Sequence, residues 1–342
     1  SARYFYCGVF NCLLFLPAFL LGVRFGVVGV AVAYAAVSYA KILPSVLYCC
    51  QGTPITPVSF LTTLLPSLAL SAGAALVNLR VAAEYFGHAY RVDVLPDRDH
   101  PNLLARLQLG LRGDTSSEDV MLFQALTRRR TNRTPYLPDP VPEELVTEMV
   151  EAAEHEGAWL VLADTEEARA AVADLVAEAD RIQWANRAFR QELAAWVRSH
   201  PGAHADGLAG HSLGIQDWLS FAGPSIIRTF DRGGGQAARD RDIALHSPAI
   251  AILGTEDDDV AAWLAAGQAL EHVLLTACAN DLCTSFLNQP VEVPELRERM
   301  ASWTGRPGAP RAVIRMGRGS DVPPTPRRGV RELLVHHQTG HS

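Results

Sequence analysis

The segment RRRTNR (residues 128–133) places four arginines within six consecutive positions of a chain whose formal net charge is −7. Guanidinium groups this close repel one another, so each must be solvated or they must share an anion. A second basic pair, Arg327 and Arg328, follows a proline-rich turn near the other end of the chain. Because one charge-assisted hydrogen bond contributes about 1.5–3 kcal/mol, two or three would retain a phosphate. Together the two segments favour a site for a phosphorylated ligand.

Other roles for residues 128–133 compete with phosphate binding. The simplest is a solvated helix end, and another is binding of anionic lipid headgroups at about 1 kcal/mol per charge. Nucleic acid is a poor candidate, because the surrounding domain is acidic and has no basic stripe interleaved with aromatic residues. No Walker motif or G-x-G-x-x-G follows an expected strand, which argues against nucleotide binding by those routes.

Charge is distributed very unevenly along the chain. The only charged side chains between Ser1 and Leu79 are Arg3, Arg24 and Lys41, whereas the remainder carries 27 basic and 37 acidic residues. A single globular domain rarely divides its charge in this way, so we expect a boundary near residues 66–80. The division predicts a hydrophobic segment over 1–68 and a soluble domain over 69–342.

The hydrophobic segment has the composition of membrane helices. Residues 4–23 form an uncharged run of the ~20 residues that a helix needs to cross a bilayer. Residues 25–49 are a second candidate, and residues 59–79 a third and weaker one. If Arg24 marks a cytoplasmic loop, three crossings leave the soluble domain membrane-anchored on the cytoplasmic side. A buried helical hairpin in a soluble core is the alternative. The first residue is serine rather than methionine, which suggests a fragment and leaves a cytoplasmic location open if the mature protein lacks residues 1–68.

Helical and strand patterns alternate along the soluble part. The expected elements are helices over 143–156, 165–186, 189–199, 259–280 and 294–303, and strands over 158–164, 249–253 and 311–317. Asp164 with Glu167, and Thr255 with Asp258, read as helix-start pairs. Residues 200–247 are punctuated by glycine and proline and are expected to be loop with short helices. These elements predict a layered α+β domain.

At its basic segments the chain resembles the Acg-like subgroup of the nitroreductase family. The resemblance is carried by RRTNR (129–133), ADRIQWANRAFRQELAAWVR (179–198), the stretch 204–233, DVAAWLAAGQALEHVLLTA (259–277), LNQPVEVPELR (287–297) and TPRR (325–328). It covers about residues 70–335. The family's fold implies a central sheet flanked by helices that holds FMN, with NADH or NADPH as reductant and a small nitro or quinone-like compound as electron acceptor.

The resemblance also implies which residues hold the flavin. By position, Arg129, Arg130, Thr131 and Arg133 match the motif that reaches the phosphate, ribityl chain and pyrimidine edge. Arg327 and Arg328 match the late phosphate-binding pair, and Leu287, Asn288 and Gln289 match the loop beside the isoalloxazine. No side chain is expected to act as a catalytic nucleophile, because the cofactor supplies the chemistry.

The chain departs from the subgroup at its beginning. It lacks the Pro-Ser-x-x-Asn-x-Gln-Pro-Trp type of stretch that helps to cover the flavin ring. Residues 1–68 instead resemble the membrane helices of polysaccharide flippases. The chain thus reads as a fusion in which half of the flavin pocket is absent, and a second chain could complete it.

Three functional alternatives remain open from sequence. One is a flavin-binding or sequestering protein without efficient turnover. Another is a membrane exporter fragment fused to a vestigial soluble domain, although two or three helices cannot enclose a transport path. The third is a metal hydrolase using His200, His204, Asp206 and His211; His-x-x-x-His in a glycine-rich loop is a weak metal signal, so no metal is expected.

Overall fold

The structure is a computed structural model that describes residues 57–100, 102–198, 208–209 and 233–322. The chain divides into two compact units, Ser1–Leu68 and Ala69–Ser342, and the features below belong to the second. The expected membrane helices at 4–23 and 25–49 lie outside the described residues. Arg327 and Arg328 also lie outside them.

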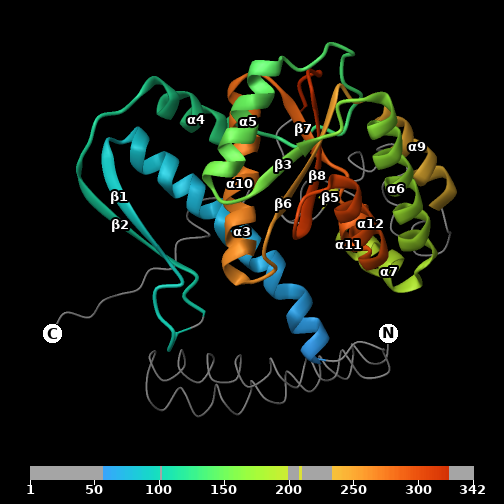
Figure 1. Cartoon of the computed structure of the whole chain (residues 1–342), viewed down its shortest axis with the longest axis horizontal. Coiled ribbons are helices and arrows are strands. Elements are labelled where there is room, and N and C mark those ends of the chain that lie inside the picture. The colour runs from blue at the N-terminus through green and yellow to red at the C-terminus, as the bar shows by residue number, and fades with distance from the viewer. Residues whose placement is uncertain (1–56, 101, 199–207, 210–232, 323–342) are drawn as a thin grey trace. The chain divides into compact units, whose positions relative to one another are not determined.

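A four-stranded antiparallel sheet forms the centre of the second unit (Figure 1). In spatial order its strands are β3 (Trp159–Leu162), β6 (Ala249–Thr255), β8 (Ala309–Gly317) and β7 (Cys283–Phe286). All seven residues of β6 are buried. This burial follows from its composition, because a strand covered on both faces needs apolar side chains in both directions.

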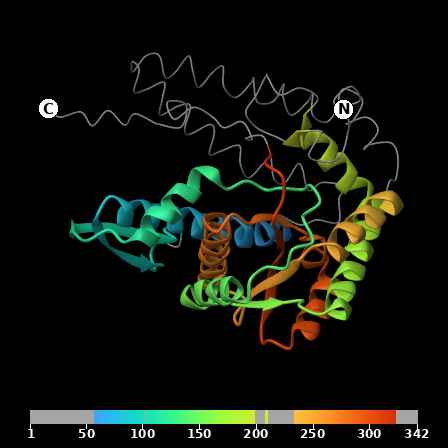
Figure 2. The same cartoon turned by 90° about the horizontal axis from the view of Figure 1, so that it is seen from above.

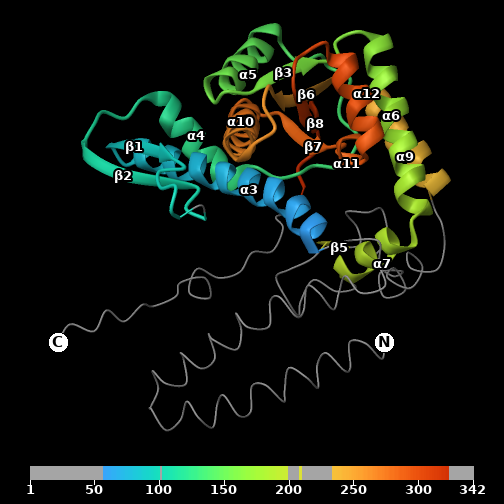
Figure 3. The ribbon, with the colours of Figure 1, turned by 60° about the horizontal axis from the view of Figure 1, so that its bottom comes forward.

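Helices cover both faces of this sheet (Figure 3). Helices α5 (Glu143–His155) and α10 (Val260–Ala279) lie on one face. On the other face lie α6 (Glu166–Ala185), α9 (Gly233–Leu245), α11 (Gln289–Glu292) and α12 (Pro294–Thr304). Along β6, Ala251 and Leu253 pack toward α10, whereas Ile250 and Ile252 pack toward α6 and α12. The expected layered sheet flanked by helices is therefore confirmed.

A second group of elements lies on the side of α10 away from the sheet (Figure 2). It comprises α3 (Pro57–Tyr85), the antiparallel hairpin of β1 (His88–Val94) and β2 (Ala105–Arg112), and α4 (Ser117–Arg128). Helices α3 and α10 approach closely at Gly73 and Gly267, where an added Cβ on Gly267 would lie 1.9 Å from the Leu70 carbonyl oxygen. The sequence patterns did not predict the hairpin.

Two helix starts differ from expectation by one residue or more. Thr165, not Asp164, caps α6 by accepting a hydrogen bond from the Ala168 amide. Asp259 caps α10 by accepting from the Ala262 amide at 2.8 Å, so the expected pairing of Thr255 with Asp258 is wrong. In each case the residue in extended conformation directly before the first helical turn has the geometry to cap it.

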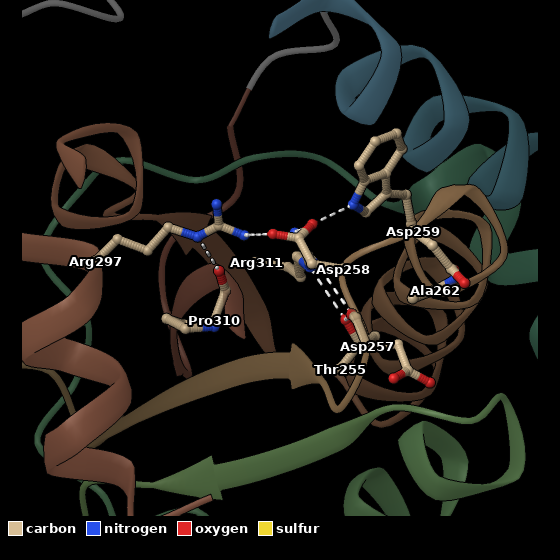
Figure 4. A network of polar contacts seen from close by, with 9 residues as sticks. Thr255, Asp257, Asp258, Asp259, Ala262, Arg297, Pro310 and Arg311 are labelled. Atoms are coloured by element: carbon tan, nitrogen blue, oxygen red, sulfur yellow. Dashed lines mark hydrogen bonds and ion pairs between the residues drawn. The ribbon is translucent and has the colours of Figure 1, made fainter. Parts of the chain in front are cut away.

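Asp258 instead takes part in a network of hydrogen bonds and ion pairs where β6, α10 and β8 meet (Figure 4). Its carboxylate accepts from Trp263 Nε1 at 2.6 Å and pairs with Arg311 at 2.8 Å and with Arg297 at 3.8 Å. Burial raises the pKa of Asp258, but the Trp263 and Arg311 contacts outweigh it and lower the pKa below its usual value. The network ties the first turn of α10 to β8 and α12.

The remaining expected elements are largely confirmed. Strands 158–164, 249–253 and 311–317 correspond to β3, β6 and β8, and helices 143–156 and 294–303 to α5 and α12. The helix expected over 189–199 is α7 (Arg187–Trp196), followed by a two-residue parallel pair, β4 (Val197–Arg198) with β5 (Leu208–Ala209). Within 200–247, expected to be loop with short helices, α9 forms a helix of 13 residues.

Two helices in the described part of the chain are long and apolar enough to cross a membrane by length and composition, Leu64–Tyr85 within α3 and Val260–Ala279, which is α10. Helix α10 is a core helix, because most of its residues are buried between the sheet, α5 and α4. The third expected span, 59–79, falls within α3, and its membrane character stays a prediction.

Candidate functional site

The basic segment begins at the carboxyl end of α4. Helix α4 starts with a capping box between Ser116 and Asp119 and ends at Arg128, with Arg129 as the residue that follows the last turn. Cations are favourable at this end of a helix because the unpaired carbonyl groups carry partial negative charge. The helix-end interpretation of Arg128 is therefore consistent with its position.

Immediately afterwards the segment joins the edge of the sheet. Thr131 forms a parallel bridge with Thr284 in β7, and the Asn132 amide donates to the Thr284 carbonyl oxygen at 2.9 Å. The Asn132 side chain is buried, and its Nδ2 donates to the Ser320 carbonyl oxygen at 2.8 Å. Backbone pairing therefore fixes the position from which the arginines project.

Three of the four arginines have partners within the protein. Arg128 pairs with Asp281 at 2.6 Å, and Arg130 donates to the Arg128 carbonyl oxygen at 2.7 Å. Arg129 Nε lies 3.3 Å from Oε1 of Glu271, a buried carboxylate on α10, but that nitrogen is buried without a hydrogen-bond partner. Arg129 thus balances an internal charge and retains an unsatisfied donor.

Arg133 differs from the other three. It is exposed and makes no hydrogen bond or ion pair with any other residue that the structure describes. Desolvation lowers its pKa from the ordinary value, and the nearby Asp240 carboxylate and Tyr136 oppose this shift. A guanidinium group without an internal partner retains its full capacity to bind an external anion.

A fifth arginine, which the sequence patterns did not single out, lies behind this segment. Arg315 in β8 is 1% exposed and donates to the carbonyl oxygens of Asn132 at 3.0 Å and Thr134 at 2.8 Å, and to Ser285 Oγ at 2.6 Å. Its guanidinium lies 3.9 Å from the centre of the Tyr136 ring. Burial lowers the pKa of Arg315, opposed by Tyr136 and Asp240. Its side chain holds the 132–134 backbone against the sheet.

The loop expected beside the flavin ring follows β7 directly. Leu287 is buried in the core between the sheet and α6, and Asn288 Oδ1 accepts from the Val313 amide at 2.9 Å. Gln289 Nε2 donates to Asp180 Oδ1 at 3.3 Å and to Asp240 Oδ2 at 3.0 Å. These three side chains therefore serve internal contacts.

The two carboxylates that hold Gln289 come from neighbouring helices. Asp180 lies on α6 and is 2% exposed, and Asp240 lies on α9, where it also accepts from Gln236 Nε2 at 3.0 Å. Burial raises the pKa of Asp180 to about 7, and the adjacent Asp240 charge adds to the shift.

The structure brings two of the three sequence-predicted segments together. Thr131 and Asn132 of the 129–133 segment pair with β7, and residues 287–289 follow the end of that strand, although the two segments are far apart in the sequence. They also meet at Asp240, which binds Gln289 and acts electrostatically on Arg133. Arg133, which is exposed and has no hydrogen bond or ion pair among the described residues, fits an anionic ligand at this edge. The contribution of Arg327 and Arg328 stays a prediction.

The buried polar residues of this region had weak signals in the sequence. Arg315 interrupts the apolar strand pattern of 311–317, and Asp180 lies in an otherwise apolar stretch of its helix face. A charged residue at a position whose neighbours require burial must find internal partners. Asp240 could not be found in this way, because its helix was not expected.

Metal binding has no support within the described part of the chain, which contains no group of three or more His, Cys, Asp and Glu side chains able to hold an ion. The four residues proposed for a metal hydrolase, His200, His204, Asp206 and His211, lie outside the described residues, so that alternative is untested.

Comparison with known proteins identifies relatives over most of the chain. No family model matches it. A protein of Mycobacterium tuberculosis strain H37Rv, provisionally named an NAD(P)H nitroreductase, is 30% identical over 273 residues, which are 78% of this chain and 76% of the relative. A second protein of that strain, provisionally named NAD(P)H nitroreductase acg, is 26% identical over 275 residues, 78% of this chain and 80% of its own length.

Among solved structures, this chain is similar to the FMN-dependent nitroreductase NfnB of Mycobacterium smegmatis, solved in complex with NADPH. The two are 15% identical with a TM-score of 0.41, and the match covers 65% of this chain and 100% of that one. The identity to the first M. tuberculosis relative extends over more than three quarters of both proteins. The chain therefore belongs to the NAD(P)H nitroreductase family.

Proposed function

We propose that the protein binds FMN at the β7 edge and uses NADH or NADPH to reduce small nitro or quinone-like acceptors. The observation that carries this proposal is that Thr131 and Asn132 pair with Thr284 in β7, while the next residue, Arg133, is exposed and has no hydrogen bond or ion pair among the described residues. Relatives named as NAD(P)H nitroreductases support the nature of the reductant and of the reaction.

The chain's own residues would bind and orient the cofactor. Arg133 is suited to an oxygen of the phosphate, or to the ring edge that gains negative charge, because it forms no ion pair with any carboxylate that the structure describes. Arg129 balances the buried Glu271 carboxylate, and Thr131 and Arg130 lie on the same sheet-bound segment. Bound FMN supplies hydride and electron transfer, and the protein supplies position and electrostatic stabilisation.

Substitution of Arg133 tests the site. The full chain is purified in mild detergent, and FMN binding is followed by quenching of flavin fluorescence. Arg133→Gln removes one charged contact of about 1.5–3 kcal/mol, so we expect FMN affinity to fall roughly 10- to 100-fold. Arg306→Gln, at an exposed arginine between α12 and β8, is the matched control and should bind as the unmodified protein does. Equal affinity in both variants would remove Arg133 from the site.

Turnover separates reduction from cofactor binding alone. Oxidation of NADPH, and separately of NADH, is measured with and without a nitroaromatic or quinone acceptor. Acceptor-dependent oxidation supports the oxidoreductase, and FMN binding without it supports the alternative of flavin sequestration. A protein that takes up no FMN would contradict both.

A separate proposal concerns the N-terminal segment, residues 1–68. We propose that residues 1–68 attach the domain to a membrane with its soluble part in the cytoplasm; the apolar composition of this segment supports it. The resemblance of 1–68 to flippase helices, and completion of the flavin site by a second chain, also stay proposals. Membrane fractionation of the full chain, with removal of residues 1–56 as the comparison, tests attachment, and release of the full chain by carbonate washing would contradict it.

A further inference from the structure

We propose that Asp180 and Asp240 share one proton and that this pair is a clasp that positions Gln289. In relation to the cofactor, this inference rests on the function proposed above. The two residues come from α6 and α9, and both accept from the same Gln289 amide group, at 3.3 and 3.0 Å.

In the described part of the chain, the hydrogen bonds around the two carboxylates leave one oxygen, Asp180 Oδ2, without a donor, and a bound proton supplies one. Asp180 is 2% exposed, and its Oδ2 atom has no donor among the described residues. The Asp180 and Asp240 carboxylates also approach each other closely, because Gln289 Nε2 lies 3.3 Å from an oxygen of the first and 3.0 Å from an oxygen of the second. Two ionised carboxylates offer only acceptors, so a hydrogen bond between them exists only when one is protonated. One shared proton satisfies the unpaired oxygen and removes the repulsion between like charges.

Surrounding charges do not replace this proton. Arg181 on α6 acts on Asp180, and Arg133 and Arg315 act on Asp240, but none of these arginines forms an ion pair with either carboxylate among the described contacts. Gln236 and Gln289 contribute neutral amides.

Several other charged groups on the helices packed around the pair are joined to one another. The surface contacts that join α6 to its neighbours are Asp174 with Arg241, Glu178 with Arg299, and Gln183 with Glu292. Tyr136 faces Arg315 and Arg133, and burial and its surroundings keep its hydroxyl neutral near pH 7, with its pKa raised to about 12. Asp180 is therefore the group near this loop whose charge changes near neutral pH, consistent with a pKa of about 7.

The clasp has a direct structural consequence for the loop after β7. Gln289 is the first residue of α11, and Leu287 and Asn288 next to it are bonded to Val313 in the sheet. When the proton leaves, a buried and a half-buried negative charge on packed helices repel each other, and the neutral Gln289 amide can donate to both carboxylates but cancels neither charge. We expect the start of α11 to become less ordered above about pH 7, and the proposed FMN site at the β7 edge to become less ordered with it.

Asp180→Asn tests the shared proton without FMN, because an amide reproduces the neutral carboxyl group in size and can donate to Asp240. In infrared spectra at about pH 6, where ordinary carboxyl groups are ionised, the full chain should show a protonated-carboxyl band that disappears by about pH 9. Asp180→Asn should lack the band. Asp174→Asn, an exposed change on α6 at a residue that pairs with Arg241 on α9, should retain it. Absence of the band in the unmodified protein would overturn the proposal.

Hydrogen exchange tests the positioning of the loop, again without FMN. The peptide covering 287–292 in the unmodified protein should lose protection above about pH 7 relative to Asp180→Asn measured at the same pH, which cancels the intrinsic pH dependence of exchange. Asp174→Asn should follow the unmodified protein. Equal protection in all three proteins at every pH would show that the pair does not position Gln289.

A final measurement links the clasp to the proposed cofactor. FMN affinity of the unmodified protein should fall several-fold between about pH 6 and about pH 9, more steeply than that of Asp180→Asn. If FMN affinity depends on pH in the same way in both proteins, the Asp180–Asp240 pair does not affect the flavin site, and its link to the cofactor is overturned. If no variant binds FMN, the proposed function fails, and the infrared and exchange experiments still decide whether the pair shares a proton and holds Gln289.

Discussion

The guanidinium group of Arg315 lies 3.9 Å from the centre of the Tyr136 ring, and the Asn132 carbonyl oxygen accepts a hydrogen bond from both side chains. A cation stacked on an aromatic ring and bonded to three oxygens is stabilised although it is buried. This arrangement fastens the basic segment to the sheet.

Replacing Arg315 should therefore destabilise the fold. Arg315→Met preserves the length of the side chain but leaves the half-buried Thr134 carbonyl oxygen and Ser285 Oγ without this donor, while the Asn132 carbonyl oxygen keeps only its hydrogen bond from Tyr136. At about 1–3 kcal/mol for each unsatisfied group, we expect the free energy of unfolding to fall by about 3 kcal/mol or more, measured in denaturant. Arg306→Met, an exposed position, should change it by less than about 0.5 kcal/mol. Similar values for the two variants would contradict the role of Arg315.

Arg129 should matter for stability through Glu271. The Glu271 side chain on α10 is 7% exposed, and Arg129 is its ion-pair partner at 3.3 Å. Arg129→Gln leaves that carboxylate buried without its cation, at a cost of about 3 kcal/mol. The double variant with Glu271→Gln should recover most of this loss, because no charge then remains unpaired. Additive effects in the double-mutant cycle would show that the two residues do not interact.

Stability should depend on pH at Glu156, which lies next to Arg80 at 2.7 Å and next to His272 at 3.2 Å. Burial raises the pKa of Glu156, but hydrogen bonds from His272 and Arg80 outweigh it and lower the pKa to about 2. The contribution of the ionised Glu156 to the free energy of unfolding is thus fully present above about pH 4.5 and is lost as the pH falls toward 2.

We expect Glu156→Gln to lower the free energy of unfolding by about 3 kcal/mol at neutral pH. The difference from the unmodified protein should shrink as the pH is lowered through this range. Glu154→Gln, an exposed change on the same helix, is the control. A difference that stays constant with pH would rule out the assigned shift.

Two glycine substitutions should have opposite effects. In Gly267→Ala the new methyl group would lie 1.9 Å from the Leu70 carbonyl oxygen, so α3 and α10 would have to separate, at a cost of about 3 kcal/mol or more. Gly235 lies in α9 with nothing within 4 Å of an added Cβ, and Gly235→Ala should stabilise by about 0.5–1 kcal/mol. Thermal unfolding measures both, and the sign of each change is the test.

The sequence was a good guide where the hydrophobic pattern was strong. The long helices α5, α6 and α10 and the strands β6 and β8 were predicted because their apolar residues recur at regular spacing or in continuous runs. Helix α9 was missed because GGGQAARDRDIAL begins with three glycines and carries few apolar residues. It is helical through its packing on α6, which is information that a local pattern does not contain.

The flavin-binding role of residues 129–133 and 287–289 stays a prediction from the family resemblance. The sequence could not show the contacts of these residues, such as the pairing of Arg128 with Asp281 or the binding of Gln289 to two carboxylates. Such pairs depend on how helices and strands pack in space, and their members are 49 to 153 positions apart in the sequence. Arg133 could be distinguished from its neighbours only once their partners were known.

The short bridge between Thr131 and Thr284 has a further consequence for the behaviour of the protein in solution. A strand at the border of a sheet can recruit a strand from another molecule and so start aggregation. In β7 the Thr284 carbonyl oxygen is already occupied by the Asn132 amide. The arginine-bearing segment therefore also shields this border, and displacing it would expose the molecule to uncontrolled self-association.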